Sequence, residues 1–322
     1  MELYLAAMAA GIILDVCLGD PHRFPHPVRA IGWLIEKTEN RVRPLFPASA
    51  RGESAAGIFF AGIILFITGA AVCFILRTSW RISPFLGAAA EAILTYYLLA
   101  ARSLRDESMK VYRALSEGDT KKARQAVSMI VGRDTERLDG AGIARAAVET
   151  VAENTSDGVI APLFYLALGG PAAGWIYKAV NTMDSMVGYR NEKYMFFGRA
   201  AARLDDAVNF LPSRLSALFM ITAAFLLRMD GKNAFCIWKR DRRNHKSPNS
   251  AQTEAACAGA LGIRLAGDTW YFGSLVKKPY IGDDLRPVET EDIRRANRLM
   301  GTAAAMAACA ALAVRWFLLS GI

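Results

Sequence analysis

The sequence predicts a mainly α-helical, polytopic integral membrane protein with about four to six membrane segments and helical cytoplasmic loops. Hydrophobic residues make up 53% of the 322 residues, more than in a typical soluble protein. These apolar residues gather in long runs, and most of the charged residues, 21% of the chain, lie between the runs. Strand signals are poor throughout. We expect one membrane domain over 1–322, with helical insertions on the cytoplasmic side at approximately 101–157 and 228–298.

Four apolar runs are predicted to cross the bilayer. The clearest, Ala55–Leu76, has 22 residues without a charge. As a helix it would rise roughly 33 Å, enough for a hydrocarbon core of about 30 Å. The runs Leu3–Gly19, Ile82–Ala100 and Leu299–Ser320 are similar, each interrupted by one charged residue.

Two further apolar segments are interrupted by helix breakers. Gly158–Val180 contains Pro162 and the triplet Gly169-Gly170-Pro171, and Phe210–Leu227 contains Pro212. Broken helices occur at membrane depth where the freed backbone lines a cavity or is covered by protein. These two segments therefore either span the membrane or are re-entrant.

The distribution of basic residues predicts the orientation. If all six segments cross, loops 20–54, 101–157 and 228–298 carry 30 Lys and Arg residues, against 6 in loops 77–81 and 181–209. Basic residues prefer cytoplasmic loops, so both termini are expected on the opposite side of the cell membrane. If the two broken segments do not cross, 181–209 is cytoplasmic as well. We prefer this version because every polar motif then lies on one face.

The charge balance and the cysteines exclude several classes of protein. With 39 Lys and Arg against 30 Asp and Glu the net charge is +9, which in a membrane protein fits anionic lipid headgroups or anionic substrates. We expect a lipid bilayer partner and no nucleic acid. The five cysteines form no C-x-x-C pair, which argues against a disulfide framework and against zinc.

The first polar cluster is the segment Gly19–Arg29, which is rich in proline and histidine. His22 and His26 are four residues apart and would offer a metal-binding face on a helix. The three prolines of the segment fix φ and oppose that helix. We predict a rigid loop at the membrane face rather than a metal site.

The second polar cluster begins at Val131–Thr135 and continues into a predicted helix, Ile143–Asn154. Arg145, Glu149 and Glu153 recur every four residues and share one face of that helix. The polar residues 154–158 are expected to end it. The helix face is either a solvated surface with an Arg–Glu pair or part of a functional site at the mouth of the broken segment.

The third polar cluster follows the first broken segment directly. Lys178, Asn181 and Asp184 are spaced by three and would lie side by side on a helix. Asp205 and Asp206 follow shortly before the second broken segment. Adjacent carboxylates with an amide suit Mg²⁺, which uses one or two carboxylates and keeps waters for substrate phosphate. The alternative is a pair of acids that caps a helix.

The fourth polar cluster, Arg240–Ser250, contains five basic residues within seven positions. It is typical either of an anion-binding site or of a juxtamembrane lipid-binding patch. The common phosphate-loop, dinucleotide, zinc-protease and serine-hydrolase motifs are absent from the sequence. Any nucleotide must therefore be held by an unfamiliar arrangement.

In this order, the four clusters strongly resemble the CobD/CbiB family, the membrane enzymes called adenosylcobinamide-phosphate synthase. The likeness runs roughly from Asp15 to Gly282. One departure is Ala251, where the family pattern leads us to expect glycine. The matching segments are Gly19-Asp20-Pro21, Pro25–Arg29, Val131–Thr135, Val148–Gly158, Tyr177–Tyr189, Ala201–Asn209 and His245–Ser250.

The resemblance implies a step of cobalamin biosynthesis. The family attaches (R)-1-aminopropan-2-ol or its O-phosphate through an amide bond to the free propionate carboxylate of adenosylcobyric acid. The product is adenosylcobinamide or its phosphate, and the enzyme is an ATP-dependent amide-forming (acid–amine) ligase. Mg²⁺ and ATP, the latter as a substrate, are inferred from the resemblance. A membrane location would suit association with later cobalamin-assembly enzymes.

A mechanism in which Mg·ATP converts the carboxylate to an acyl phosphate assigns hypothetical roles to the matched residues. Asp184, Asp205 and Asp206 are expected to hold Mg²⁺, and the catalytic candidates are Glu153, Asp157, Lys178 and Asp184. The candidates for binding substrate or phosphate are Arg29, Arg133, Asp134, Asn154, Asn181, Ser185, Arg203, His245, Lys246, Ser247 and Asn249.

Two other classes of protein remain open. A membrane transporter would use the break at Gly169-Gly170-Pro171 as its binding site, although the polar clusters gather at segment ends rather than at mid-membrane depth. An AmpE-like non-catalytic membrane sensor would have no need of the Asp and Asn clusters. The sequence does not distinguish a phosphorylated amine substrate from the free amine.

Overall fold

The structure is a computed structural model that describes residues 1–20, 26–189, 191–271 and 273–321. It is mainly helical. Within the described residues four helical stretches are long and apolar enough to cross a membrane, and they confirm the predicted class of polytopic helical membrane protein: Ala50–Ile82, Pro84–Ser116, Gly140–Val187 and Glu291–Ser320. The bent pair Arg199–Val208 and Phe210–Leu226 would add a fifth.

The chain forms two compact units. The first comprises Met1–Ala100, Pro162–Asn209 and Cys309–Ile322, and the second comprises Ala101–Ala161 and Phe210–Ala308. The first contains α1 (Glu2–Leu18), α2 (Pro27–Val42), η1 (Arg43–Leu45), α3 (Ala50–Ile82), α4 (Pro84–Tyr96), most of α8 (Ala161–Val187), α9 (Arg199–Val208) and the end of α13 (Glu291–Ser320).

The second unit contains the remaining elements. Its helices are α5 (Ala101–Ser116), α6 (Thr120–Ser128), α7 (Gly140–Asn154), the π-helical turn η2 (Thr155–Ile160), α10 (Phe210–Leu226), α11 (Gly231–Asp241), α12 (Ser250–Leu261) and the start of α13. Its strands are β1 (Leu265–Ala266), β2 (Thr269–Tyr271), β3 (Ser274–Val276) and β4 (Tyr280–Ile281).

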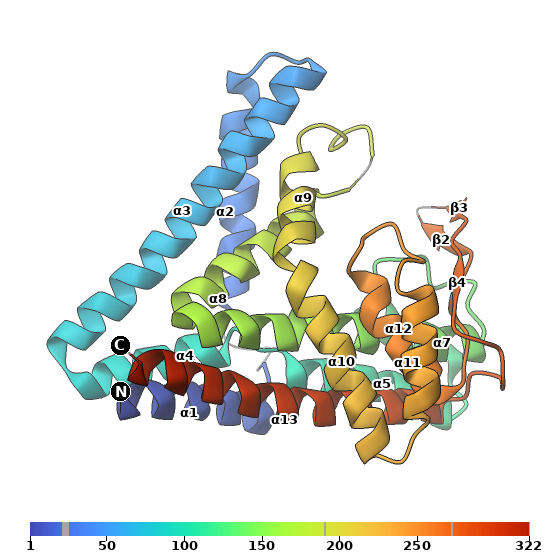
Figure 1. The fold of residues 1–322 in the computed structure, drawn as a ribbon. Coiled ribbons are helices and arrows are strands. Elements are labelled where there is room, and N and C mark those ends of the chain that lie inside the picture. Colours follow the sequence, from blue (N-terminus) through green and yellow to red (C-terminus); the bar gives the residue numbers. More distant parts are fainter. Residues whose placement is uncertain (21–25, 190, 272, 322) are drawn as a thin grey trace. The chain divides into compact units, whose positions relative to one another are not determined.

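In the first unit, α3 carries the longest apolar run and shows the two faces of a lipid-facing helix. Ser49 begins it, because the Ser49 hydroxyl accepts a hydrogen bond from the Gly52 amide at 3.1 Å. Phe60 and Ile64 are buried, whereas Phe66 and Phe74 are exposed. Helix α2 packs beside α3 as an antiparallel hairpin, and α1 packs on α4 (Figure 1). Helix α1 is not among the four long helices, because its 17 residues rise only about 26 Å.

Helix α8 is broken at the predicted triplet. Gly169 and Gly170 have non-helical dihedral angles, with φ +64° at Gly170. A Cβ atom on Gly170 would lie 3.1 Å from the Arg315 Nη2 atom. The prediction of a break at Gly169-Gly170-Pro171 is therefore confirmed, and glycine is needed there both for the backbone and for space.

The predicted interruptions earlier in this stretch are wrong. Residues 154–158 do not end the helix, because α7 passes through η2 directly into α8. Pro162 lies in the first turn of α8 and does not break it. A π-helical turn already departs from the regular hydrogen-bond pattern of an α-helix. A proline beside it therefore removes fewer helix hydrogen bonds than a proline in a regular helix would. Such turns are frequent at functional sites.

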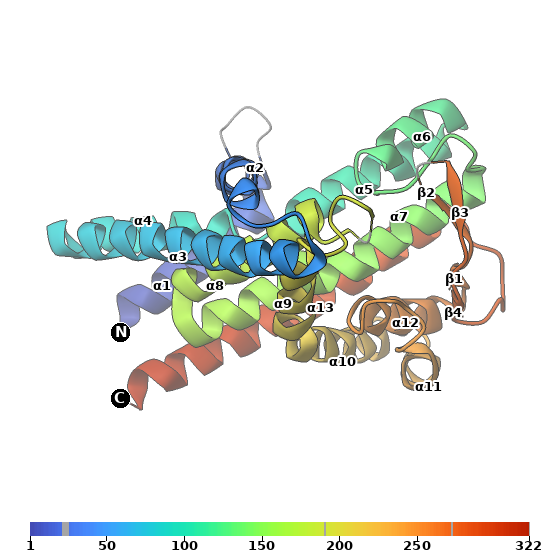
Figure 2. The same cartoon turned by 90° about the horizontal axis from the view of Figure 1, so that it is seen from above.

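In the second unit, α5 and α6 form a helix–turn–helix whose turn contains Gly118 and Asp119. Gly118 has φ +76°, and the Asp119 carboxylate caps α6 by accepting from the Lys122 amide at 2.9 Å. Figure 2 shows α5, α6 and α7 next to one another, and these helices contact each other. Helix α12 packs against α7, α10 and α11.

Four short strands replace part of the helix predicted for 228–298. Strand β1 pairs antiparallel with β4, and β2 pairs antiparallel with β3. Each strand has only two or three residues. Strands this short carry no readable alternation of apolar and polar residues, which explains why the sequence did not indicate them.

Candidate functional site

In the first unit, a group of polar side chains gathers on α8 and α9. We call Tyr177, Asn181, Asp184, Asp205 and Asn209 the aspartate–amide cluster. Buried Asp205 accepts hydrogen bonds at Oδ1 from Asn209 Nδ2 at 2.9 Å and from Asn181 Nδ2 at 3.5 Å. The Tyr177 hydroxyl in turn donates to Asn209 Oδ1 at 2.9 Å. The contact between Asn181 on α8 and Asp205 on α9 joins the two helices.

Negative charge accumulates in the aspartate–amide cluster. The carboxylates of Asp184 and Asp206 lie close enough to Asp205 for their charges to act on it. Oxygen donors of this kind are the ligands that Mg²⁺ prefers. Asp205 and Asp206 are adjacent on α9 and point in different directions. In the part of the chain that the structure describes, no three acidic, histidine or cysteine side chains converge as a ready-made metal site. Mg²⁺ binding here stays a prediction.

The other candidates of the first unit lie at more open positions. Lys178 is half-buried on α8, and the Ser185 hydroxyl donates to the Asn181 carbonyl one turn earlier at 2.9 Å. Arg203 and Arg29 are exposed. Arg29 lies in the first turn of α2, which His26 caps by accepting from the Val28 amide at 3.2 Å. His22 and the prolines at 21 and 25 lie outside the described residues.

In the second unit, another group of charged and polar side chains gathers where α12 packs against α7. We call it the glutamate cluster, and its members are Arg133, Glu149, Glu153, His245, Glu254 and Lys278. The charges of Glu153, Glu149, Arg133 and Lys278 all act on Glu254. Glu153 and Lys278 also act on His245. The fold therefore joins candidates from the second and fourth sequence clusters.

Glu149 anchors one side of the glutamate cluster. It is 3% exposed, and its Oε1 atom accepts from the Ala266 amide at 2.7 Å. Its Oε2 atom is paired with the Arg133 guanidinium. Burial would lower the pKa of Arg133, but the adjacent Glu149 carboxylate raises it above its usual value. Arg133 is therefore held as a fixed positive charge against α7.

Asp134 holds the neighbouring β hairpin in place. Its amide donates to the Trp270 carbonyl at 3.0 Å, and its Oδ2 atom accepts from the Gly273 amide at 2.8 Å. Arg137 stacks over the Trp270 ring at 4.3 Å. These contacts fix the loop that carries Arg133 relative to β2 and β3.

Glu254 is the least satisfied group of the glutamate cluster. It is 6% exposed, and its Oε2 atom has no hydrogen-bond partner within the described residues. Burial, together with the Glu153 and Glu149 charges, raises the pKa of Glu254 well above its usual value. Burial in turn lowers the pKa of His245, so this imidazole is neutral at pH 7.

The basic groups of the cluster have defined partners. His245 Nδ1 accepts from the Ser247 amide at 3.1 Å. Lys278 donates to the Tyr271 hydroxyl at 2.8 Å. Lys246 is exposed. The cluster therefore brings together the Glu254 carboxyl group, the neutral His245 imidazole and the cations of Arg133 and Lys278.

The remaining candidates of the second unit contact the backbone or neighbouring polar groups. Asn249 Oδ1 accepts from Arg214 Nη1 at 2.7 Å and from the Ser213 hydroxyl at 3.2 Å. The Ser247 hydroxyl accepts from the Asn249 amide at 3.3 Å. Asn154 donates to the Thr150 carbonyl at 3.0 Å, and Asp157 is half-buried in η2.

Sequence reasoning missed Glu254 and Lys278 as members of a site. Glu254 is the one acidic residue of α12, a helix otherwise composed of small and uncharged residues. A charged residue in such a buried helix is a readable signal. Lys278 gave only a weak signal, because its place in the cluster depends on how the β hairpins fold back.

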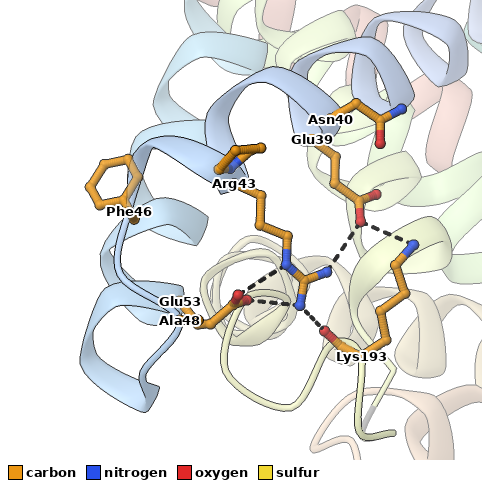
Figure 3. Close-up of a pocket in the computed structure, with 8 residues that line it drawn as sticks. Glu39, Asn40, Arg43, Phe46, Ala48, Glu53 and Lys193 are labelled. Carbon is orange, nitrogen blue, oxygen red and sulfur yellow. Dashed lines mark hydrogen bonds and ion pairs between the residues drawn. The ribbon is translucent and has the colours of Figure 1, made fainter.

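A separate cavity of about 470 Å³ lies beside the hairpin of α2 and α3 (Figure 3). Arg43 occupies its centre and pairs with Glu53 at 2.9 Å and Glu39 at 3.4 Å. Arg43 also donates to the Lys193 carbonyl, and Lys193 pairs with Glu39 at 3.1 Å. The two cations of this network are paired with its two carboxylates. The network therefore links the α2–α3 hairpin to the segment before α9.

The four candidate spans define a polytopic helical membrane protein, and its structure holds two clusters of buried polar side chains. A sequence model of the CobD/CbiB proteins matches residues 8–300. The chain belongs to the CobD/CbiB family of cobalamin biosynthesis proteins, which confirms the predicted resemblance. Membership implies corrinoid-related substrates.

Relatives in several bacteria are similar over nearly their whole length. "Cobalamin biosynthesis protein CobD" of Clostridium perfringens is 47% identical over 308 residues, which cover 96% of this chain and 97% of the relative. The Klebsiella pneumoniae protein of that name is 46% identical over 314 residues, 98% of each chain. "Cobalamin biosynthesis protein CbiB" of Salmonella typhi is 46% identical over 303 residues, 94% and 95% of the two chains. No solved structure matches the chain.

Proposed function

We propose that the protein attaches (R)-1-aminopropan-2-ol, or its O-phosphate, to the free propionate carboxylate of adenosylcobyric acid in an ATP-dependent reaction. The observation that carries the proposal is the family match over residues 8–300. The glutamate cluster adds chemical support, because a zwitterionic amine phosphate needs both carboxylate and cationic partners. An amide bond is the natural link between such an amine and a corrinoid carboxylate.

The chemistry must first activate a carboxylate, which is a poor acyl donor. A propionate oxygen would attack the γ-phosphorus of ATP, and ADP would leave, giving an acyl phosphate. The amine nitrogen would then attack the carbonyl carbon. The bond from that carbon to the phosphate oxygen breaks, inorganic phosphate leaves, and the nitrogen loses a proton. Such chemistry depends on placing the reactants and neutralising phosphoryl charge.

The proposed roles follow from the two clusters. In the first unit, Asp184 and Asp205, with Asp206 nearby, would hold Mg²⁺, and the ion would neutralise phosphoryl charge. Lys178 and Arg203 would face the phosphoryl oxygens. The oxygen-only donors and the accumulated negative charge of the aspartate–amide cluster fit a hard divalent cation.

In the second unit, the basic residues Arg133, His245 and Lys246 would bind the anionic end of the amine substrate. Glu153 or Asp157 would accept the proton that the amine nitrogen loses. Charged groups that are shielded from water interact more strongly than they do in water.

The test is a reaction with the purified full-length protein in nanodiscs, supplied with adenosylcobyric acid, the aminopropanol phosphate and Mg·ATP. We expect a corrinoid product heavier by one aminopropanol phosphate residue, formed only with both ATP and metal. The Asp205→Asn variant should lose about 100-fold or more in rate, whereas Asp284→Asn, an exposed acid in the second unit, should keep full rate. No product from the wild type with corrinoid bound would overturn the proposal. Neither product nor corrinoid binding would favour a transporter or a sensor.

A further inference from the structure

Glu254 is a buried carboxyl group that the proposed roles do not use. It projects from the middle of α12, and nine of the eleven other residues of that helix are small or apolar. Its Oε2 atom is buried and has no hydrogen-bond partner within the described residues. A buried acceptor without a partner carries a free-energy penalty, since it has lost its hydrogen bonds to water. The position therefore suits a group that a ligand completes.

The cations that act on Glu254 are fewer than the carboxyl groups around them. The carboxylates of Glu149 and Glu153 on α7 both lie close enough to Glu254 for their charges to act on it. Of the two cations that act on Glu254, Arg133 is paired with Glu149 and Lys278 donates to the Tyr271 hydroxyl. A further cation would be stabilised beside Glu254 and Glu153.

We propose that Glu254 and Glu153 form the subsite that binds the ammonium group of the amine substrate, with Lys278 and His245 facing the anionic end of the same molecule. This inference rests on the proposed function and names how one of its substrates is recognised. An ammonium group has three N–H donors, and carboxylates on two packed helices supply acceptors from different directions. Glu254 then determines specificity by selecting an amine over a neutral molecule of the same shape.

The experiment compares two probes that differ only in the amine. These are 1-aminopropan-2-ol O-phosphate and propan-2-yl phosphate, and binding to the full-length protein in nanodiscs is measured by calorimetry without ATP or corrinoid. We expect the wild type to bind the amine probe about tenfold or more tightly than the amine-free probe. The Glu254→Gln variant should bind the amine-free probe unchanged and lose that preference.

Thr253→Val is the matched control, because Thr253 is the neighbouring buried residue and its hydroxyl also has no hydrogen-bond partner within the described residues. It should keep the wild-type preference. If Glu254→Gln, eluting as a monodisperse species, kept the preference, or if the wild type had none, the inference would be overturned. Product formation by the wild type is assayed separately. A Glu254-dependent preference without any amide product would therefore contradict the proposed reaction but support the amine subsite.

Discussion

At the scale of single residues, the buried carboxyl groups of the two clusters differ in how fully their oxygens are hydrogen-bonded. Asp205 receives two amide N–H donors, and Glu149 receives a guanidinium and a backbone amide. Both are therefore held in fixed positions. Glu254 lacks a partner for one oxygen within the described residues. A ligand can gain binding energy at Glu254 that is not available at the satisfied groups.

The raised pKa of Glu254 predicts how stability depends on pH. In the unfolded chain Glu254 loses its proton near its usual pKa of 4.5, whereas the folded protein holds the proton to well above that value. The stability from this group is therefore complete below pH 4.5 and is lost as the pH rises through the folded pKa. The Glu254→Gln variant cannot ionise, so its Tm should increasingly exceed the wild-type Tm as the pH rises above 4.5.

Thermal unfolding in nanodiscs between pH 4 and pH 9 measures this difference. Each kcal/mol gained should raise Tm by about 2–4 °C. Parallel curves for wild type and Glu254→Gln over the whole range would contradict the assignment of a raised pKa.

The sequence predicted only those neighbours within each candidate site that lie on one helix, because their contacts are local. Lys178, Asn181 and Asp184 share a helix face, so their proximity follows from spacing alone. Glu254 joins Glu149 and Glu153 only because α12 packs on α7, a contact between residues about a hundred positions apart. Sequence spacing does not predict contacts between residues so far apart in the chain. From the sequence alone, Glu254 was therefore only an isolated acidic residue.

At the scale of elements, helix breakers act according to what surrounds them. Gly170 has φ +64° and lies against Arg315, so the chain breaks there as the sequence predicted. Pro162 follows a π-helical turn and does not break its helix. The break in α8 could be predicted from the sequence because Gly169-Gly170-Pro171 combines two glycines with a proline. The π turn could not, because it depends on the packing of η2 against α10 and α5.

The break in α8 makes a testable stability prediction. Gly170→Ala should destabilise the protein by about 1–2 kcal/mol, because a Cβ atom is disfavoured at positive φ and would approach the Arg315 guanidinium. Gly62→Ala is the control, since Gly62 lies within α3 and a Cβ atom there would meet nothing within 4 Å. It should be neutral or stabilising. Equal Tm values for Gly170→Ala and the wild type would show that the break does not require glycine.

At the scale of the whole molecule, the distribution of basic residues predicts how the chain crosses the membrane. We propose that residues 228–298 face the cytoplasm and that the C-terminus lies on the other side. The exposed Cys236 on α11 reports on the first region. The exposed Ser320 at the end of α13 reports on the second after substitution.

Two single-cysteine proteins test this orientation. In one, Cys236 is kept and the other cysteines are replaced by alanine. In the other, all five are replaced and Ser320→Cys is added. A membrane-impermeant maleimide should label the first only in inverted vesicles and the second only in right-side-out vesicles. Labelling of both from the same side would contradict the orientation.

In the proposed reaction the protein activates a corrinoid carboxylate by phosphoryl transfer and then forms an amide. Adenosylcobyric acid labelled with ¹⁸O in its free propionate tests both steps together. Each turnover should yield the amide product and one inorganic phosphate carrying a single ¹⁸O atom, because the propionate oxygen leaves with the phosphate. An amide product with no ¹⁸O in the phosphate, or with the label in AMP, would contradict the proposed reaction.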